Sequence, residues 1–344
     1  MPTDAIQRVE QAITEIKKGR MVIMMDDEDR ENEGDLVYAA TFSTPEMVNF
    51  MAKEARGLIC TPVTKEIASK LALIPMVDNN ISNHETAFTV SIDSTSAQTG
   101  ISADERDDCI SKLANPQTIS EDFVRPGHIF PLIAKDGGVL VRTGHTEGSV
   151  DLCKLAGLAP VGVICEIIKD DGTMARMDDL EIFSQKHTMP IVYISDIVAY
   201  RLANEKLIER ISQEESSLRG EVVEKILYSD HLDRIHTVIV FDKAQERTNV
   251  KFHNIGLDID MVLDDKRFNA LNNAIEHLKQ YGGVLIFLDT KVISHEQAKE
   301  FGVGAQILKD LGIKHINLLT TNKETEFVGL AGFGLDVVEK VEVR

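Results

Sequence analysis

Residues 26–35 carry seven carboxylates around a single arginine, Arg30, directly after the apolar run at residues 21–25. So many like charges in one short loop repel each other in water unless a cation or a donor-rich ligand compensates them. Carboxylate oxygens are also the ligands that hard divalent cations prefer. The loop therefore predicts a metal or polyol site.

Two simpler interpretations of this loop compete with a binding site. A charged run after a strand is often only a solvated turn. A calcium loop of the EF-hand type would use Asp29, Glu31 and Glu33 as its first ligands. Its last position requires a bidentate glutamate but holds Ala40 here, and the preceding residues are typical of a strand. The sequence thus argues against an EF-hand.

Two residues of the first half are candidates for proton transfer. His128 precedes an apolar run, so we expect it to project from a rigid loop, although a lone histidine is more often structural than catalytic. Glu166 lies inside the apolar run at residues 161–167. A carboxylate in such a strand must pair, bind a ligand or hold a raised pKa, which is how general acids and bases arise.

Residues 142–149 follow a predicted strand and open a predicted helix. Their glycines let backbone N–H groups approach a ligand, and the start of a helix favours an anion. Arg142 and Thr146 add a guanidinium and a hydroxyl, whereas an ordinary strand-to-helix turn requires neither Arg142 nor His145. Together with the acidic loop and the two proton-transfer candidates, this segment suits magnesium-assisted chemistry on a sugar phosphate.

The elements that must position these residues alternate between strands and helices. The first half therefore predicts an α+β fold of the α/β type, with a mixed sheet covered by helices. Strands are expected at residues 21–25, 36–41, 57–63, 86–92, 129–134, 138–142, 161–167 and 191–194, and helices at residues 6–16, 44–56 and from about 196.

The chain becomes polar and charged at residues 204–220, which places a domain boundary there. We expect a first domain at residues 1–205 and a second at residues 206–344, since 344 residues exceed what one core usually serves. The second domain is also predicted to be of the α/β type. Its expected strands lie at residues 222–228, 236–241, 284–288 and 315–319, and its helices at residues 267–281 and 294–311.

Composition excludes several kinds of partner. The formal net charge of -19 argues against nucleic acids and anionic membrane surfaces, because both are polyanions. No run approaches the roughly 20 apolar residues of a membrane span, and no signal peptide is recognisable, so we expect a cytoplasmic protein. The cysteines form no C-x-x-C pair and are expected to be reduced core thiols. They are Cys60, Cys109, Cys153 and Cys165.

At the residues singled out above, the chain resembles a known family. The strings DDEDRENEGD, RPGHIFPL, RTGHTEGSVDL and CEI are similar to the signatures of 3,4-dihydroxy-2-butanone 4-phosphate synthase, an enzyme of riboflavin biosynthesis. The similarity spans about residues 5–200. It implies a lyase that converts D-ribulose 5-phosphate into formate and 3,4-dihydroxy-2-butanone 4-phosphate. It also implies Mg²⁺ or Mn²⁺, with one or two ions per site, and a homodimer whose active sites lie near the subunit interface.

Matched motif by motif, the resemblance assigns roles to individual residues. Glu31 and His145 would be the protein ligands of the metal, and His128 and Glu166 would transfer protons. Loss of a proton beside a ketone produces an enediolate, whose charge a divalent cation stabilises. The residues that would contact the substrate are Arg30, Glu31, Asp35, Arg142, Thr143, Gly144, His145, Thr146 and Glu166.

One segment departs from the family pattern. Residues 100–109 resemble a motif that usually ends in threonine, where this chain has Cys109, and that carries aspartate where this chain has Glu105. A thiol is a weaker hydrogen-bond donor than a hydroxyl. We therefore expect weaker substrate binding if Cys109 contacts the phosphate.

The C-terminal part, at residues 301–335, is similar to GTP cyclohydrolase II. That family binds zinc through three cysteines and carries two catalytic motifs, which are replaced here at residues 289–294 and 321–325. The second half has no cysteine, so we expect no zinc. We expect a silent scaffold that supports the dimer or binds a regulator. The alternatives are an enzyme with a different site and a bifunctional enzyme that retains GTP cyclohydrolase II activity.

Overall fold

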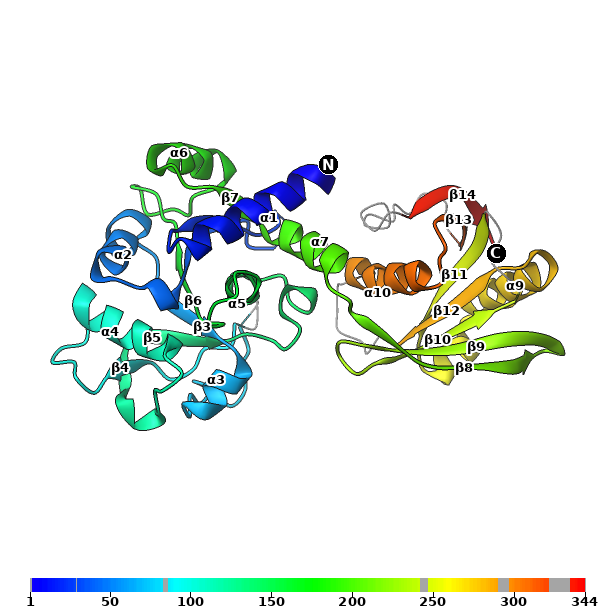
Figure 1. Cartoon of the computed structure of the whole chain (residues 1–344), viewed down its shortest axis with the longest axis horizontal. Helices are drawn as coiled ribbons and strands as arrows, with labels where there is room; N and C mark the ends of the chain where they lie inside the picture. Colours follow the sequence, from blue (N-terminus) through cyan, green and yellow to red (C-terminus); the bar gives the residue numbers. More distant parts are fainter. Residues whose placement is uncertain are drawn as a thin grey trace. The chain divides into compact units, whose positions relative to one another are not determined.

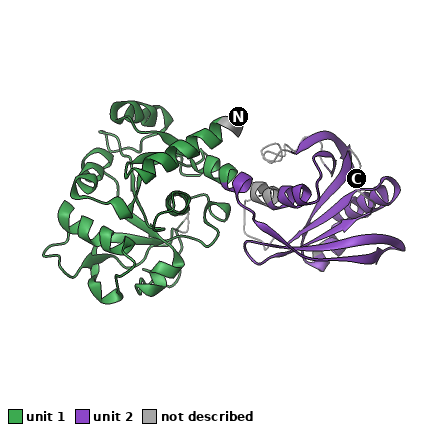
Figure 2. Cartoon of the chain, viewed as in Figure 1, with its two compact units in different colours: residues 1–200 green, residues 201–344 purple. Residues whose placement is uncertain are grey.

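The computed structural model describes residues 2–28, 30–82, 86–241, 247–289, 297–321 and 335–343. The chain divides into two compact units, Met1–Tyr200 and Arg201–Arg344 (Figure 2). This division lies close to the boundary expected near residue 205. Each unit contains its own seven-stranded sheet with helices, so the mixed α/β-type fold expected for both halves is confirmed.

Unit 1 alternates strands and helices along most of its length (Figure 1). Its elements are α1 (Pro2–Lys17), β1 (Val22–Met25), β2 (Gly34–Ala39), η1 (Ala40–Phe42), α2 (Pro45–Phe50), η2 (Met51–Ala55), β3 (Cys60–Val63), α3 (Lys65–Lys70), β4 (Ile92–Ser94), α4 (Ala103–Ala114), η3 (Ser120–Asp122), β5 (Phe123–Ile133), η4 (Gly138–Leu140), α5 (His145–Leu155), β6 (Gly162–Glu166), α6 (Met177–His187), β7 (Ile191–Tyr193) and α7 (Ile194–Asn204).

The sheet of unit 1 has the strand order β4-β5-β3-β6-β2-β1-β7. It is mixed, because β3 pairs parallel with β5 and β1 with β7, whereas the other neighbouring pairs are antiparallel. Helices α1, α5 and α7 contribute to the core on one face, and α2, α4 and α6 contribute to the core on the other. The sheet is therefore buried between two helical layers, which explains why its strands read as apolar runs without alternation.

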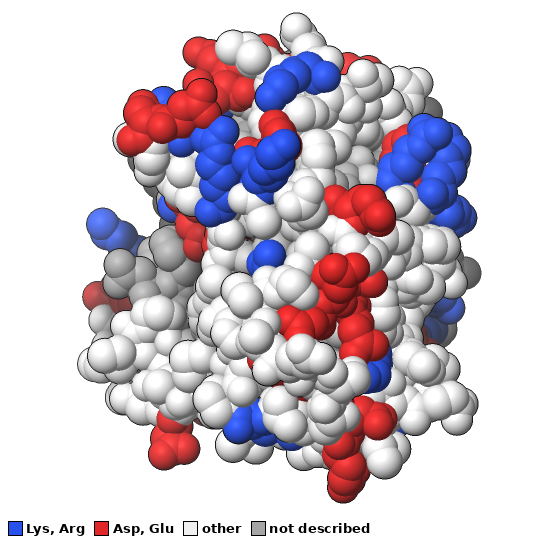
Figure 3. All heavy atoms as spheres, turned by 90° about the vertical axis from the view of Figure 1, so that its left-hand side faces the viewer, with Lys and Arg blue, Asp and Glu red and all other residues white. Residues whose placement is uncertain are grey.

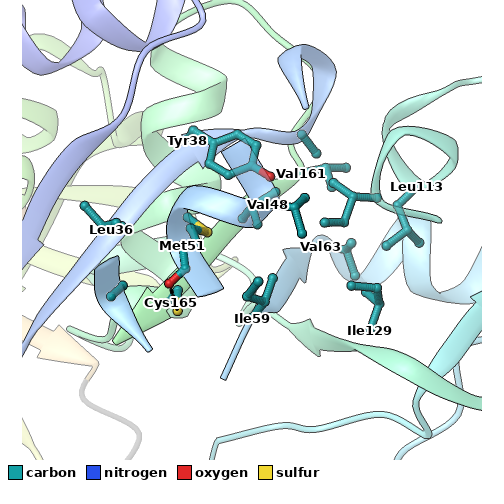
Figure 4. Close-up of a cluster of buried hydrophobic side chains, with 14 of the residues drawn as sticks. Leu36, Tyr38, Val48, Met51, Ile59, Val63, Leu113, Ile129, Val161 and Cys165 are labelled. Atoms are coloured by element: carbon teal, nitrogen blue, oxygen red, sulfur yellow. Dashed lines mark hydrogen bonds between the residues drawn. The ribbon is translucent and has the colours of Figure 1, made fainter. Parts of the chain in front are cut away.

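The core under α2 and α4 shows how these layers are packed. Tyr38 from β2 has no exposed surface and extends over Val48, while Val63 and Ile129 come from neighbouring parts of the sheet (Figure 4). The hydroxyl group of Tyr38 lies 3.1 Å from Oγ of Ser43, so its polar end is satisfied. This dense packing fixes the strands whose ends carry the candidate site.

Two predicted strands of unit 1 are wrong. Residues 86–91 form only isolated bridges, and the strand β4 is confined to Ile92–Ser94. Residues 138–140 form the 3₁₀ helix η4 because Gly137 and Gly138 adopt positive φ angles of 90° and 62°, and because the carboxylate of Asp151 accepts the N–H of Val139. The apolar residues there point into the core without belonging to the sheet.

Unit 2 contains the second sheet, with the strand order β14-β13-β11-β12-β10-β9-β8. Strands β11, β12, β13 and β14 are parallel to their neighbours within this set, and β8, β9 and β10 form an antiparallel part. Its elements are β8 (Ile208–Leu218), β9 (Glu221–Asp230), β10 (Ile235–Val240), β11 (Thr248–Ile255), α8 (Asp258–Leu263), α9 (Asp265–Tyr281), β12 (Val284–Asp289), α10 (Gln297–Asp310), β13 (His315–Thr320) and β14 (Asp336–Glu342).

The polar segment in which the sequence predicts the domain boundary, residues 204–220, is mostly strand β8 of unit 2. It forms a hairpin with β9 through Arg219 and Gly220, which both adopt positive φ angles, as two-residue hairpin turns require. Most of β8 is exposed, and it is an edge strand. Because neither face of such a strand needs apolar residues throughout, its sequence is typical of a linker.

Candidate active site

The acidic loop between β1 and β2 is folded around one of its own carboxylates, Asp26. Oδ2 of Asp26 accepts hydrogen bonds from Nη1 of Arg30 (2.7 Å) and the N–H of Glu31 (3.1 Å), and Oδ1 accepts the N–H of Glu33 (2.8 Å). Asp26 is buried and its side chain is fully enclosed. The repulsion within the run is thus relieved partly by Arg30 and by backbone donors. Asp29 lies outside the described residues.

His145 lies against this loop although it is more than a hundred residues away in sequence. It is the first residue of α5, which packs on β1, β2, β3 and β6, and it is buried. Its Nδ1 lies 3.8 Å from Oε2 of Glu31, and its Nε2 lies 3.9 Å from Oδ1 of Asp35 and 3.2 Å from the carbonyl oxygen of Met24. The structure therefore brings the two predicted metal ligands, Glu31 and His145, together.

A third residue completes a group that could hold a cation. One ligand atom each from Asp26, Glu31 and His145 lies within 4.8 Å of the others. Within the described part of the chain, this is the one group of three such side chains found. Two carboxylates and an imidazole are ligands that fit Mg²⁺ or Mn²⁺. Asp26 was not predicted as a ligand, although it opens the acidic run that drew attention to the loop.

Asp35 gives independent support for a positively charged ligand. Its side chain is almost fully buried, and its Oδ1 has no hydrogen-bond partner. Buried carboxylate oxygens are nearly always satisfied by donors, water or cations. An unsatisfied oxygen 3.9 Å from the ring of His145 therefore indicates that something else occupies this position when the site functions.

The charges of the cluster shift its pKa values strongly. Burial, reinforced by Glu166 and Glu31 against the opposing charge of His145, raises the pKa of Asp35 to about 7. Burial disfavours ionised Glu31 as well, but His145 and Arg30 outweigh it and lower the pKa of Glu31 to about 2. Burial disfavours protonated His145, yet Asp35 and Glu31 raise its pKa to about 9. The carboxylates of the cluster therefore favour a positive charge between them.

Residues 142–146 lie at the start of α5. Nη1 of Arg142 donates to Oε2 of the buried Glu147 (2.6 Å), and Nη2 donates to Oγ1 of Thr86 (3.2 Å). Gly144 is the N-cap of α5, and a Cβ atom there would collide with Nη1 of Arg142 and come within 3.1 Å of Nη2 of Arg30. The two guanidinium groups therefore converge on a backbone without a side chain, as a bound anion would require.

A cavity of about 480 Å³ opens beside these residues. Glu31 lines it on one side, and Thr86, which binds Arg142, lines it on another. Pro75, Met76 and Phe88 provide an apolar wall. Thr143 is half-buried and Thr146 is buried. The cavity is large enough for a small phosphorylated sugar.

The sheet places Glu166 beside the acidic cluster. In the pairing of β2 with β6, Asp35 lies opposite Glu166, so the two side chains lie on the same face of the sheet. Oε2 of Glu166 accepts a hydrogen bond from the N–H of Leu58 (2.8 Å). Glu166 is only half-buried, because it is the last residue of β6 and not enclosed within the strand as expected. Its charge is therefore available at the mouth of the cluster.

His128 lies further along the sheet. It belongs to β5 and not to a preceding loop as predicted, because the pairing of β4 with β5 extends that strand back to Phe123. Phe130 of β5 and Ile164 of β6 both pair with Cys60 of β3, so β5 is two strand spacings, roughly 10 Å, from β6. Among the described residues, the side-chain partner of His128 is Asp93, whose Oδ2 lies 2.8 Å from Nδ1. Within one chain, His128 is therefore not in contact with the cluster of Asp26, Glu31 and His145.

The departure at Cys109 has a structural explanation. Cys109 has no exposed surface, and its Sγ lies 3.8 Å from the carbonyl oxygen of Ile92 in the core. Because Cys109 is enclosed in the core, the condition for weaker substrate binding, a contact of Cys109 with the phosphate, has no support in the structure. Glu105 accepts hydrogen bonds from the N–H groups of Gln98, Thr99 and Gly100 and thereby fixes the turn before α4.

In unit 2, much of the cyclohydrolase-like sequence lies outside the described residues, including 290–296 and 322–334. Asp289, at the end of β12, donates its N–H to Nδ1 of the buried His236 (3.1 Å). The histidines of the second half, which could in principle bind a metal at a different site, are His231, His236, His253, His277, His295 and His315. In the described part of this unit, they form no group of three metal-ligating side chains.

The chain thus consists of two α/β units, of which the first carries a cluster of carboxylates and an imidazole that could hold a metal ion. Comparison with known proteins agrees. The family model for 3,4-dihydroxy-2-butanone 4-phosphate synthase matches residues 10–200, and that for GTP cyclohydrolase II matches residues 290–342. The chain therefore belongs to the 3,4-dihydroxy-2-butanone 4-phosphate synthase family, with a GTP cyclohydrolase II-like segment in its second unit.

Relatives that match nearly the whole chain are named 3,4-dihydroxy-2-butanone 4-phosphate synthase or riboflavin biosynthesis protein. The chain is 56% identical to 3,4-dihydroxy-2-butanone 4-phosphate synthase of Wolinella succinogenes, covering 98% of each chain. It is 41% identical to the riboflavin biosynthesis protein RibBA of Bacillus cereus, covering 98% of this chain and 93% of that protein. The protein is thus a lyase of riboflavin biosynthesis, and the bifunctional alternative is not favoured.

Solved structures agree with the fold. RibBX, a two-domain 3,4-dihydroxy-2-butanone 4-phosphate synthase from A. baumannii, is 39% identical with a TM-score of 0.83, covering 98% of this chain and 99% of that chain. A 3,4-dihydroxy-2-butanone 4-phosphate synthase in complex with two magnesium ions is 40% identical with a TM-score of 0.55, covering 57% of this chain and 97% of that chain.

Proposed function

We propose that unit 1 converts D-ribulose 5-phosphate into formate and 3,4-dihydroxy-2-butanone 4-phosphate at the cluster of Asp26, Glu31 and His145. The observation that carries this proposal is the convergence of these three ligand atoms beside the unsatisfied Oδ1 of Asp35. An arginine-lined helix start and a cavity adjoin them. A ketose phosphate offers neighbouring oxygens for a cation at one end and a phosphate dianion at the other.

The cation would be Mg²⁺ or Mn²⁺, one or two per site, held by Glu31 and His145 with Asp26 as a further ligand. It would supply positive charge for the enediolate that forms when a proton leaves the carbon beside the ketone. Asp35 and Arg30 would hold hydroxyl groups of the sugar. Burial of Asp35 and His145 would exclude bulk water from the reacting carbons.

The phosphate would lie at the start of α5. Arg142 would provide charge and Thr143 and Thr146 hydroxyl groups, and Gly144, which has no side chain, would let the phosphate approach the backbone. The reaction needs several proton transfers, which we assign to Glu166 and His128. Glu166 fits because it is half-exposed beside Asp35. His128 fits because its ring is 43% exposed and anchored at one nitrogen only.

The protein would function as a homodimer with active sites near the subunit interface. Most of the exposed large apolar side chains of unit 1 lie in residues 58–81 and 101–124, and exposed apolar surface, where it is contiguous, marks interaction sites. The residues are Leu58, Ile74, Met76, Val77, Ile81, Ile101, Ile119 and Val124. Some of them flank the cavity beside Glu31, and Val124 shares β5 with His128.

We assign residues 1–205 to the synthase domain and residues 206–344 to a non-catalytic scaffold, and we place the protein in the cytoplasm. Within the described residues, no helix is both long and apolar enough to cross a membrane. On the face of unit 1 seen in Figure 3, basic side chains are scattered among acidic ones and broad uncharged areas. This pattern supports a small-molecule substrate without nucleic acid or membrane partners.

The test measures formate release from ribulose 5-phosphate by the full chain, with substrate titrations for each variant. His128→Ala and Glu166→Gln should lower kcat by more than about tenfold and change KM little, as expected for proton-transfer groups. Glu54→Gln is the control, because it alters a carboxylate that pairs with Lys186 outside the cluster. If both variants raised only KM, the two residues would be binding groups and the assignment would be wrong.

A further inference from the structure

His128 is held by a carboxylate to which no motif drew attention. Oδ1 of Asp93 in β4 accepts the backbone N–H of His128 (2.8 Å), and Oδ2 lies 2.8 Å from ring atom Nδ1. The side chain of Asp93 is 10% exposed, whereas that of His128 is 43% exposed. A buried carboxylate thus holds both the backbone and one ring nitrogen of an accessible histidine.

This geometry selects one tautomer of the ring. An ionised carboxylate only accepts hydrogen bonds, so Nδ1 must carry the proton that faces Asp93. In the neutral ring, the lone pair is then on Nε2, for which the described residues provide no hydrogen-bond partner. The same arrangement of carboxylate and imidazole holds the general base of hydrolases in its working tautomer. Nε2 of His128 is therefore prepared to accept a proton and to return it.

Two glycines let the backbone pass close to this pair, and the close contacts leave the two side chains little freedom to move. Gly100 adopts a φ of 80°, and a Cβ atom there would overlap Oδ2 of Asp93 and lie 2.6 Å from Nδ1 of His128. A Cβ atom at Gly127 would overlap the backbone of Ile92 and Asp93. Two close backbone approaches thus confine the carboxylate and the ring, as a positioned proton-transfer group requires.

A second pair of this type, in unit 2, shows what a purely structural one looks like. Oδ2 of Asp230 lies 3.2 Å from Nε2 of His236, but Nδ1 of His236 accepts the N–H of Asp289 (3.1 Å). Both ring nitrogens are occupied, and the ring is buried. His236 therefore has no free atom for chemistry, whereas His128 has one.

We propose that Asp93 is a positioning residue of the synthase reaction, which fixes His128 in the tautomer that exposes the basic Nε2. The proposal rests on the proposed role of His128 in proton transfer. According to this proposal, Asp93 does not contact the substrate and affects the reaction only through the ring of His128. It follows that the loss caused by changing Asp93 must depend on the presence of His128.

The test compares three variants of the full chain. Asp93→Asn retains the shape and can still accept the N–H of His128, but its amide donates to Nδ1 and so favours the opposite tautomer. We expect kcat to fall roughly 10- to 100-fold, the scale of general acid–base catalysis, with KM within threefold. Ser91→Ala is the matched control, since Oγ of Ser91 accepts the neighbouring N–H of Gly127 (3.1 Å) without touching the ring. It should retain kcat within about twofold, because no proton-transfer group is altered.

Two further measurements separate positioning from support of the backbone. In a His128→Ala background, Asp93→Asn should have no additional effect on kcat. Nitrogen-15 spectra of labelled histidine should show the His128 ring protonated at Nδ1 in the parent and at Nε2 in Asp93→Asn. The proposal is overturned if Asp93→Asn retains kcat, if its effect persists without His128, if Ser91→Ala loses as much, or if the tautomer is unchanged. If instead His128→Ala retains full kcat, the proposed role of His128 fails, and the spectra still decide whether Asp93 sets the tautomer.

Discussion

Replacement of Asp35 by asparagine should raise the stability of unit 1 at pH 8 and lower its activity. In the metal-free protein, this buried carboxylate has an unsatisfied oxygen and a pKa of about 7, compared with about 4 in an unfolded chain. Ionised Asp35 therefore opposes folding. The difference of about 3 pKa units corresponds to about 4 kcal/mol at pH 8, and the attraction of His145 is already included in that pKa.

The expected gain is smaller than this figure, because a buried amide N–H without a partner costs roughly 2 kcal/mol. Asp35→Asn should thus stabilise unit 1 by about 2 kcal/mol at pH 8, or roughly 4–8 °C in Tm for a unit of this size. Because the pKa of Asp35 is raised in the folded state, its ionisation costs no stability below the pKa of the unfolded chain, near 4. This cost grows between pH 4 and about pH 7 and stays constant above pH 7. At pH 4, the variant should therefore be less stable than the parent.

The assay is calorimetric unfolding of the full chain with a chelator at pH 4 and pH 8, together with formate release in Mg²⁺. The control is Asp151→Asn, which alters a buried carboxylate that accepts the N–H of Val139 and should destabilise at both pH values. Activity of Asp35→Asn should fall more than about a hundredfold, since a sugar contact is lost in the transition state. A variant that is less stable than the parent at pH 8 would refute the reasoning.

Four more outcomes are expected. Chelation should abolish formate release and Mg²⁺ or Mn²⁺ restore it, while Glu31→Gln and His145→Ala each lose more than roughly a hundredfold; full activity in chelator would exclude a metal. Residues 1–205 alone should release formate, because both cores of unit 1 lie within them; a folded but inactive truncation would implicate unit 2. Asp230→Asn should destabilise unit 2 by about 3 kcal/mol at pH 7 and remove part of its acid sensitivity below pH 4. Burial raises the pKa of Asp230, but the hydrogen bonds from His236 and Arg234 outweigh it and lower that pKa; an unchanged unfolding transition of unit 2 in calorimetry would contradict this. The chain should bind no stoichiometric zinc and release no formate from GTP, because unit 2 has no cysteine; one zinc per chain in elemental analysis would reverse that expectation.

Much of the site could be predicted because its chemistry is local in sequence. The acidic loop, the start of α5 and the end of β6 could each be recognised by an unusual combination of residues beside a strand. The fold class followed from the alternation of apolar runs. Failures occurred where local pattern and structure diverge, as at residues 138–140, where positive φ angles at Gly137 and Gly138 convert an apolar run into η4.

Asp93 could not be predicted for a different reason. It is one acidic residue in a short strand, and its partner His128 is thirty-five residues away. Whether such an aspartate faces solvent, a helix or a ring depends on the pairing of β4 with β5, which includes a register shift after Ile92. Local sequence contains no sign of that shift, so a non-local pair of this kind becomes visible only in the structure.

The acidic loop itself shows why residue type does not reveal role. Asp26 and Asp35 lie in the same run, yet the carboxylate of Asp26 accepts three hydrogen bonds within the loop while Oδ1 of Asp35 accepts none. The difference arises from α5, because Nε2 of His145 lies 3.2 Å from the carbonyl oxygen of Met24 but 3.9 Å from Oδ1 of Asp35, beyond hydrogen-bond distance. The hydrogen bonds of Asp26 therefore hold the loop together, whereas Oδ1 of Asp35 has no such partner. A fold that retains such an uncompensated carboxylate loses stability at its site, which is the expected condition of a site that gains its missing partners only with cation and substrate.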